Sequence, residues 1–250
     1  MTEHLRIDRH GDVLLVSLAR PEKKNALTGA MYEALIGAFA EADREAIGAL
    51  VITGAGGAFT AGNDIADFLA YAASPADAPP FRFVRALARL DTPLVAAVEG
   101  VAFGIGTTLL LHCDLAYAAP SARFRMPFVD LGLVPEAGSS LLLPQRVGIA
   151  KASELLMLAE PFDAAEALRL GLLNAVVSSE ALLDRALDEA RRLAAKPREA
   201  LRATRRLIRG DRTTLHAVIE AEAAAFGQAL ASPAAQAAFA AFLAKPKSAS

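Results

Sequence analysis

The stretch from Thr92 to Ser140 restricts the fold of this chain more than any other part of the sequence. It begins with Leu94 to Val98, an apolar run with the length and valine content of a buried strand. Gly100, Gly104 and Gly106 then interrupt the chain before a second apolar run, which predicts a strand, a tight turn and the start of a helix. The first N–H groups of a helix have no internal partners and attract negative charge. The turn is therefore a candidate site for an oxyanion.

An acidic residue stands at the start of another predicted helix later in this stretch. Glu136 lies between Pro135 and Ala137, ahead of the apolar run Leu141 to Leu143. One interpretation is that the glycine turn holds an anion while Glu136 supplies a base. The other is that Glu136 complements the dipole of the helix that it opens, a common use of an acidic residue. The residues alone leave both interpretations open.

The composition limits the classes of protein to which the chain can belong. With 250 residues it can form one large domain, or a domain with an appendage, and bury its own core without disulfides. Its only cysteine, Cys113, has apolar neighbours and is interpreted as a small buried side chain, which fits a reducing compartment. Lysine and arginine total 26 against 28 for aspartate and glutamate, so the chain lacks the basic bias of nucleic-acid-binding proteins. We expect no nucleic acid partner.

Neither export nor membrane insertion is indicated by the sequence. The N-terminus is charged from its first residues and lacks a signal-peptide pattern, so we expect a cytoplasmic protein. The longest uncharged stretch of the central segment, Gly100 to Cys113, is shorter than the roughly 20 residues that span a bilayer, so no membrane partner is expected. The four histidines have no metal-ligand spacing, and no metal site is expected.

Strand and helix patterns alternate along the first part of the chain and then give way to helices alone. Gly11-Asp12 predicts a hairpin between Leu5–Arg9 and Val13–Leu18, and Thr28 is predicted to cap the helix that follows. The glycines from 54 to 57 lack the spacing of a dinucleotide-binding loop, so no nicotinamide cofactor is expected. The other predicted elements are strands at Ala49–Thr53 and Asn174–Val177 and helices at Ile65–Ala70, Phe81–Leu90, Ala137–Arg146, Ala150–Leu158, Ala164–Leu170, Ala181–Ala195, Ala200–Ile208, Thr214–Leu230 and Ala234–Ala244.

Four segments, taken together and in this order, resemble the crotonase superfamily of enoyl-CoA hydratases and isomerases. They are RPEKKNAL (20–27), FTAGNDI (59–65), PLVAAVEG (93–100) and DLGLVPEAGSS (130–140). The resemblance implies an α/β fold, a spiral of ββα units that forms two stacked sheets, with a C-terminal helical trimerisation region. We therefore expect a crotonase core domain over residues 1–195 and a helical oligomerisation region over residues 196–250.

The resemblance also implies an acyl-CoA thioester as substrate, no separate cofactor and a place in fatty acid β-oxidation. In the family the thioester oxygen is held by two backbone N–H groups, which map to Asn63 and Ile105. Further residues that it places at the substrate are Lys24, Ala26, Ala61, Asp64, Ile65, Phe103, Gly104, Thr108, Phe128 and Pro135, with Phe242 and Lys245 reaching it from a neighbouring subunit. Asp64 has a second interpretation as a helix cap, and Lys24, with Lys23 and Arg20, as part of a solvated charge run.

The carboxylates separate the reactions that such a protein could perform. Family hydratases use two glutamates, and the corresponding positions here hold Thr108 and Phe128, which cannot titrate near neutrality. Glu136 stands instead where the peroxisomal type of Δ3,Δ2-enoyl-CoA isomerase carries its carboxylate, so the resemblance implies an isomerase with Glu136 as proton shuttle. Another crotonase reaction, hydratase-like or ring-opening, and a non-catalytic acyl-CoA-binding protein are the alternatives. Asp130 is interpreted as a loop hydrogen-bonding residue.

The helices of the C-terminal third carry more alanine and leucine than a short tail needs for its own core. An apolar surface of that size is seldom left exposed on a soluble monomer. We therefore expect these helices to pack on a neighbouring subunit and the chain to form a homotrimer or a dimer of trimers, as the resemblance implies.

Overall fold

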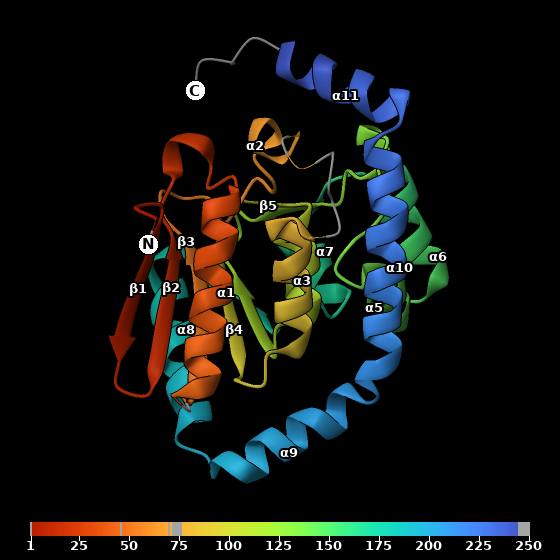
Figure 1. The fold of residues 1–250 in the computed structure, drawn as a ribbon. Helices are drawn as coiled ribbons and strands as arrows, with labels where there is room; N and C mark the ends of the chain where they lie inside the picture. Colours follow the sequence, from red (N-terminus) through yellow and green to blue (C-terminus); the bar gives the residue numbers. More distant parts are fainter. Residues whose placement is uncertain (1, 46, 70, 72–76, 245–250) are drawn as a thin grey trace.

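The structure is a computed structural model that describes residues 2–45, 47–69, 71 and 77–244. It has the α/β architecture of two sheets that the sequence implies (Figure 1). In the described part of the chain, a six-stranded sheet has the order β1-β2-β3-β4-β6-β9 and a three-stranded sheet has the order β5-β7-β8. The larger sheet consists of β1 (Leu5–His10), β2 (Val13–Leu18), β3 (Ala49–Gly54), β4 (Leu94–Val98), β6 (Leu115–Ala118) and β9 (Ala175–Val176). The smaller sheet consists of β5 (Val101–Phe103), β7 (Arg123–Arg125) and β8 (Phe162–Asp163).

Helices and helical turns connect these strands. The first half of the chain contains η1 (Pro21–Lys23), α1 (Gly29–Arg44), α2 (Ile65–Leu69), α3 (Pro79–Arg89), α4 (Ile105–Thr108) and η3 (Leu109–His112). The second half contains η4 (Val129–Leu131), α5 (Ser139–Val147), α6 (Ile149–Ser153), the π-helical turn η5 (Glu154–Leu158), α7 (Ala164–Arg169), α8 (Ser179–Ala194), α9 (Arg198–Arg209), α10 (Arg212–Leu230) and α11 (Pro233–Ala244).

The larger sheet is covered on both faces because successive side chains of each strand point to opposite sides. Leu14 and Leu50 belong to the main core with α1 and α3, whereas Val13 and Val51 pack in a second cluster under α8. Figure 1 shows α1 and α3 in front of the sheet and α8 behind it. The first two strands form the predicted hairpin, and the strands that follow pair in parallel. Such doubly covered parallel strands account for the continuous apolar runs in the sequence.

Several local predictions are confirmed, whereas the strands β5, β6, β7 and β8 were not predicted and two predicted helices differ from the structure. The Thr28 hydroxyl accepts a hydrogen bond from Met31 N at 3.3 Å and caps α1 as expected. The helix predicted from Ala137 begins at Ser139, because Ala137 and Gly138 both have positive φ angles, 59° and 68°, that no α-helix contains. The helix predicted at Ala150–Leu158 becomes π-helical from Glu154. Most of the loop between Ala70 and Pro80 lies outside the described residues.

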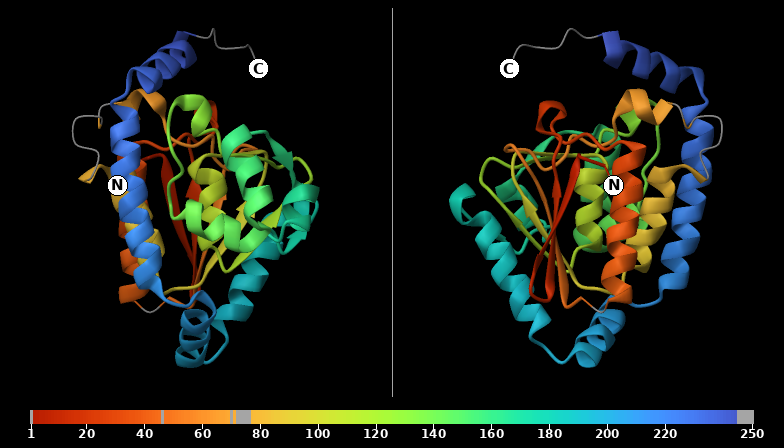
Figure 2. Two further views of the ribbon diagram at one scale, coloured as in Figure 1. Left: turned by 90° about the vertical axis from the view of Figure 1, so that its right-hand side faces the viewer. Right: turned by 60° about the vertical axis from the view of Figure 1, so that its left-hand side comes forward.

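The C-terminal helices do not all have the role expected from the sequence. Helix α10 packs beside α3 and α5 of its own chain (Figures 1 and 2), where Phe226 contacts the rings of Phe68 and Phe81. The expectation of packing on a neighbouring subunit is therefore wrong for the buried face of α10, which completes the core of its own chain. On α9, Leu207 and Ile208 are 83% and 80% exposed. The division of the chain at residue 195 remains a prediction.

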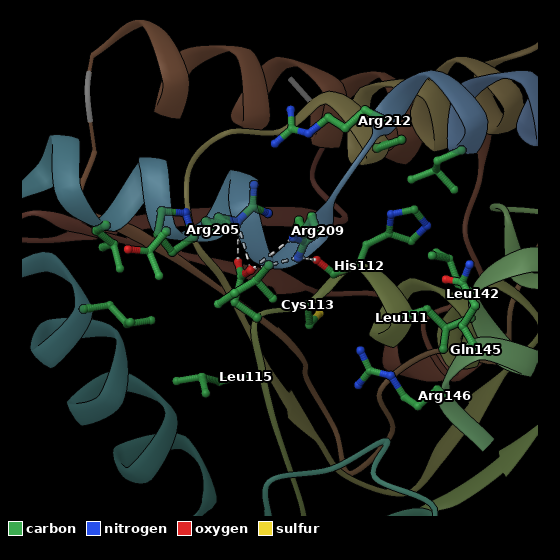
Figure 3. Close-up of a pocket in the computed structure, with 18 residues that line it drawn as sticks. Leu111, His112, Cys113, Leu115, Leu142, Gln145, Arg146, Arg205, Arg209 and Arg212 are labelled. Carbon is green, nitrogen blue, oxygen red and sulfur yellow. Dashed lines mark hydrogen bonds and ion pairs between the residues drawn. The ribbon is translucent and has the colours of Figure 1, made fainter. Parts of the chain in front are cut away.

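A cavity of about 470 Å³ lies between α9 and the core (Figure 3). Asp114 at its wall accepts hydrogen bonds from Arg205 and Arg209 of α9. Cys113 borders the same cavity and is buried, as the sequence indicates. No helix in the described part of the chain is long and apolar enough to cross a bilayer.

Candidate active site

The side chain of Glu136 is buried against the first turn of α4. Glu136 is 7% exposed, and its Oε1 accepts a hydrogen bond of 2.5 Å from the hydroxyl of Thr108. Thr108 lies three positions after Ile105, which places it about 4.5 Å farther along the axis of α4. The structure thus brings together the two loops that the sequence suggested for an anion and a base.

Burial is the main influence on the protonation of Glu136. It raises the pKa of Glu136 to about 8, because a carboxylate without surrounding water is costly. The hydrogen bond from Thr108 opposes this rise in pKa, and the negative charge of Glu222 adds to it. A carboxyl with such a pKa can take up and return a proton near neutral pH.

Two backbone N–H groups lie at corresponding positions of adjacent parallel segments. Thr60 and Ala102 form a parallel bridge, in which Phe103 N donates to Thr60 O at 3.0 Å. Asn63 lies three residues after Thr60, and Ile105 lies three residues after Ala102. No acceptor among the described residues takes a hydrogen bond from Asn63 N, and Ile105 N opens α4, where a helix has no internal acceptor. The pair therefore remains the candidate oxyanion hole that the resemblance implies.

A third segment, residues 24–27, is hydrogen-bonded to the segment that carries Asn63. Ala61 N donates to Lys24 O at 2.9 Å, and Leu27 N donates to Gly62 O at 2.8 Å. The structure thereby gathers a group of the expected substrate residues on neighbouring segments: Lys24, Ala26, Ala61, Asp64, Ile65, Phe103 and Gly104.

Two of the charged residues in this region have structural partners. Asp64 accepts a hydrogen bond from Asp67 N at 3.2 Å, as expected for a cap of α2, and pairs with Arg20 at 2.6 Å. Arg20 also donates to Ala26 O, so its guanidinium holds the loop together. Lys24 is exposed at the end of η1.

The remaining expected residues fall into two groups. Phe128 is buried and Pro135 half-buried in the segment that leads to Glu136. Asp130 in the same segment is paired with Arg125 at 2.7 Å and exposed, which agrees with a loop role. Phe242 belongs to α11, which packs against η4, but its side chain lies outside the description, as does all of Lys245.

Sequence reasoning missed the residues that hold the turn around Glu136. Ser139 donates to Glu136 O from both its N–H and its hydroxyl. His112 Nε2 lies 2.7 Å from Ala137 O, and this nitrogen must carry the proton because a carbonyl oxygen only accepts. Glu222 of α10 accepts from Gly138 N at 2.6 Å. The sequence contains one indication of Glu222, because this charged residue interrupts the apolar face that Ile219, Ala223 and Phe226 form on α10.

Tyr32 was missed as well. Its hydroxyl donates to Oδ1 of Asn63 from the buried face of α1. The pKa of Tyr32 is raised well above its ordinary value, chiefly by burial and then by the charges of Glu136 and Asp67. Tyr32 therefore orients the loop that carries the Asn63 amide and stays protonated while doing so.

Comparison with known proteins places the chain among acyl-CoA enzymes. Residues 8–249 match the family model described as enoyl-CoA hydratase/isomerase. The chain is 39% identical over 193 residues to 1,2-epoxyphenylacetyl-CoA isomerase of Escherichia coli, covering 74% of each chain. It is 34% identical over 223 residues to enoyl-CoA delta isomerase 2 of Rattus norvegicus, covering 86% of this chain and 57% of the rat protein. Other matched proteins are named probable enoyl-CoA hydratases.

The fold agrees with these matches. The structure of OdaA from Pseudomonas aeruginosa superimposes with a TM-score of 0.94 and 44% sequence identity, covering 98% of this chain and all of that one. A family match over nearly the whole length, relatives above 30% identity and a shared fold lead to one conclusion. The chain belongs to the enoyl-CoA hydratase/isomerase family, within the crotonase superfamily.

Proposed function

We propose that this protein is an enoyl-CoA isomerase that moves the double bond of a 3-enoyl-CoA thioester to the 2-position. The observation that carries the proposal is the buried Glu136, bonded to Thr108 one helical turn from the Ile105 amide. One base and one oxyanion hole are sufficient for this reaction, because the proton that leaves one carbon returns to another.

In the proposed mechanism the Glu136 carboxylate removes a proton from C2 of the substrate. The electron pair of that C–H bond moves into the thioester, and the N–H groups of Asn63 and Ile105 stabilise the dienolate oxygen. Glu136, now a carboxylic acid, gives the proton to C4, and the electron pair of the former 3,4-double bond forms the new C–H bond. The electron pair of the enolate double bond then forms the 2,3-double bond, and the thioester carbonyl is restored. Loss of one donor from an oxyanion hole typically costs about 3 kcal/mol in transition-state stabilisation. No atoms are gained or lost, so the proposed reaction needs no cofactor or metal.

The same residues argue against ordinary hydration. Adding water to a 2-enoyl-CoA needs one group to activate the water and another to protonate the neighbouring carbon. The two positions that resemble the glutamates of hydratases hold Thr108 and Phe128. Glu222 is a second buried carboxylate near Glu136, but its oxygens are bonded to the start of α5. It is therefore not free to activate water.

A ring-opening isomerisation is the second candidate function. It is favoured by the similarity to 1,2-epoxyphenylacetyl-CoA isomerase, which has the higher identity of the two isomerases. This reaction would use the same oxyanion hole and the same carboxyl. The two candidates differ in substrate, because an epoxide on a ring has no counterpart in a linear 3-enoyl chain.

Incubation of the pure protein with 3-enoyl-CoA and 2-enoyl-CoA in deuterated water tests the proposal. We expect interconversion of the two thioesters, with solvent deuterium entering C2 or C4, and loss of both signals in Glu136→Gln. Rapid hydration of 2-enoyl-CoA without isomerisation of 3-enoyl-CoA would contradict the proposal. Turnover of an epoxide substrate alone would favour the second candidate. Binding of acyl-CoA without any proton exchange would indicate a non-catalytic binding protein.

We also propose that the protein assembles as a homotrimer or a dimer of trimers. The observation that supports this is the pair of apolar side chains, Leu207 and Ile208, that α9 leaves exposed. Helix α10 gives less support, because its large apolar side chains Ile219, Phe226 and Leu230 are buried within the same chain.

A further inference from the structure

Glu222 connects the C-terminal helix α10 to the turn that carries Glu136. It is 8% exposed and lies across 84 residues of sequence from Gly138. Its Oε2 accepts from Gly138 N at 2.6 Å, and its Oε1 accepts from Ser140 N at 2.9 Å and from the Ser140 hydroxyl at 2.5 Å. All three partners donate, which is the pattern that an ionised carboxylate requires.

The position of this carboxylate is electrostatically favourable for α5. The first N–H groups of a helix have no internal acceptor, and the helix dipole places partial positive charge there. Glu222 supplies the acceptor and the negative charge from another helix. The Gly138 site is also closely packed, because a Cβ added there would lie 2.4 Å from Leu215 Cδ1 of α10. Helix α10 thus fixes the start of α5 through both hydrogen bonds and packing.

The turn needs such support because of its backbone conformation. Ala137 has a φ of 59°, and a non-glycine residue in this left-handed region costs about 1 kcal/mol or more. His112 holds the Ala137 carbonyl from the η3 side of the turn. Glu222 holds the next N–H group from the α10 side. Between them the two side chains hold the C=O and the N–H of one peptide group, the one that joins Ala137 to Gly138.

We propose that Glu222 is a positioning residue for the isomerisation: its carboxylate fixes the turn that carries Glu136 and keeps a second negative charge beside the base. The inference rests on the proposed function for its catalytic consequence only. Glu222 does not touch the reacting atoms in this proposal. It acts through Gly138 and Ser140 on the backbone, and through its charge on the Glu136 carboxyl.

The other ionisable groups around Glu136 leave Glu222 as the dominant charge. Among the described residues, Tyr32 of α1 interacts electrostatically with Glu136, and burial keeps this phenol protonated. His112 of η3 contacts the neighbouring residue, and burial lowers the pKa of His112 to about 4, so it is neutral at pH 7. Glu222 of α10 is the charged group that raises the pKa of Glu136.

The variants Glu222→Gln and Glu222→Asp change the two effects differently, because Asp keeps the charge whereas Gln removes the charge together with one of the two accepting oxygens. In Gln the negative charge is lost while the size is kept, so the pKa of Glu136 should fall. The rising limb of the pH–rate profile should then move to lower pH by about half a unit or more. In Asp the charge is kept but the side chain is one carbon shorter. The rising limb of the pH–rate profile should therefore stay at the same pH, while kcat falls about tenfold because Glu136 is misplaced. Glu220→Gln is the matched control, because it makes the same change on the exposed face of α10, where Glu220 pairs with Arg85.

A measurement without substrate keeps this inference distinct from the proposed function. The free energy of unfolding is followed against pH for wild type and Glu136→Gln, and then for both in the Glu222→Gln background. The difference within each pair reports the titration of Glu136. We expect its midpoint to move to lower pH in the second pair even if no substrate is turned over.

The results that would overturn the inference are equally specific. It is wrong if Glu222→Gln leaves the Glu136 titration at the wild-type pH, or if its kinetics match those of Glu220→Gln. If Glu222→Gln does not fold, Glu222→Asp decides, and wild-type kcat in that folded variant contradicts a positioning role.

Discussion

The hydroxyl of Thr108 donates a hydrogen bond of 2.5 Å to Oε1 of Glu136, across 28 residues of sequence. Both groups are buried, so water does not compete for this bond. A hydroxyl that donates to a carboxylate favours its ionised form, whereas burial favours its protonated form. The balance of these two effects sets the pH at which Glu136 can act as a base.

Thr108→Val should make Glu136 harder to ionise. It keeps the shape of the side chain but removes the donor that lowers the pKa of Glu136. The pKa should rise further above 8, so the rising limb of the pH–rate profile should move to higher pH and turnover at pH 7 should fall about tenfold. Thr108→Ser, which retains the hydroxyl, is the control. Identical profiles for the Val and Ser variants would contradict a functional bond.

Glu136→Gln should abolish most isomerase activity. Gln nearly preserves the shape of Glu but cannot accept a proton, and loss of a general base typically costs about 10²–10⁴-fold in rate. Binding of a saturated acyl-CoA, measured by calorimetry, should hardly change. Wild-type turnover in this variant would reduce Glu136 to a helix-terminal acid.

The wild-type enzyme should become more active as the pH rises. Glu136 must be ionised to remove the C2 proton, and its pKa in the unliganded protein is about 8. The value of kcat/KM, which reports the free enzyme, should therefore increase through pH 8 and level off above it. A profile that is flat between pH 6 and pH 9, an interval of about one unit or more on each side of the pKa, would show that another group is the base.

The buried Glu136 should also make stability depend on pH. Its pKa is raised from an ordinary 4.5 to about 8 in the folded state, so the folded protein binds more protons than the unfolded chain between these values. The free energy of unfolding should fall with rising pH across this window, by up to about 1.4 kcal/mol per unit from this group. Below pH 4.5 and above pH 8 its contribution should be constant. Chemical denaturation of wild type and Glu136→Gln at several pH values measures the difference, which should vanish toward low pH.

The mass in solution tests the proposed assembly. Light scattering at micromolar concentration should give three or six times the chain mass of 26.1 kDa. Replacing both Leu207 and Ile208 by lysine should shift the mass toward the monomer, because their exposed apolar surface would become charged. Circular dichroism should show that the variant is folded. A wild-type mass of 26.1 kDa would contradict the assembly.

The local parts of the site were predictable from the sequence. Leu94–Val98 is apolar throughout and became β4, and Gly104 became the N-cap residue of α4, although the short strand β5 lies between them. Thr28 was recognisable as a cap because its hydroxyl acts on Met31, only three residues away. Glu136 was recognisable from its motif. In each case the pattern and its structural cause lie within a few residues of each other.

The contacts between distant segments were not predictable. The strands β5, β7 and β8 have only two or three residues each, too few for an alternating pattern to be read. The hydrogen bond from Thr108 to Glu136 depends on how two distant segments pack together. Helix α10 packs on α3 and α5 of its own chain, although its composition also fits packing on a neighbouring subunit. His112 and Glu222 could be noticed as polar residues among apolar ones, but their partners could not be named.

Glu222 lies 84 residues after Gly138, so the hydrogen bond between them can form only late during synthesis. The chain is made from its N-terminus, so both sheets and the Glu136 turn leave the ribosome before residue 222 exists. Until α10 arrives, Gly138 and Ser140 have no carboxylate to accept their N–H groups. We therefore expect a nascent chain that already has its sheets but whose Glu136 turn is not yet held in place. Full activity would then require that α10 has been made.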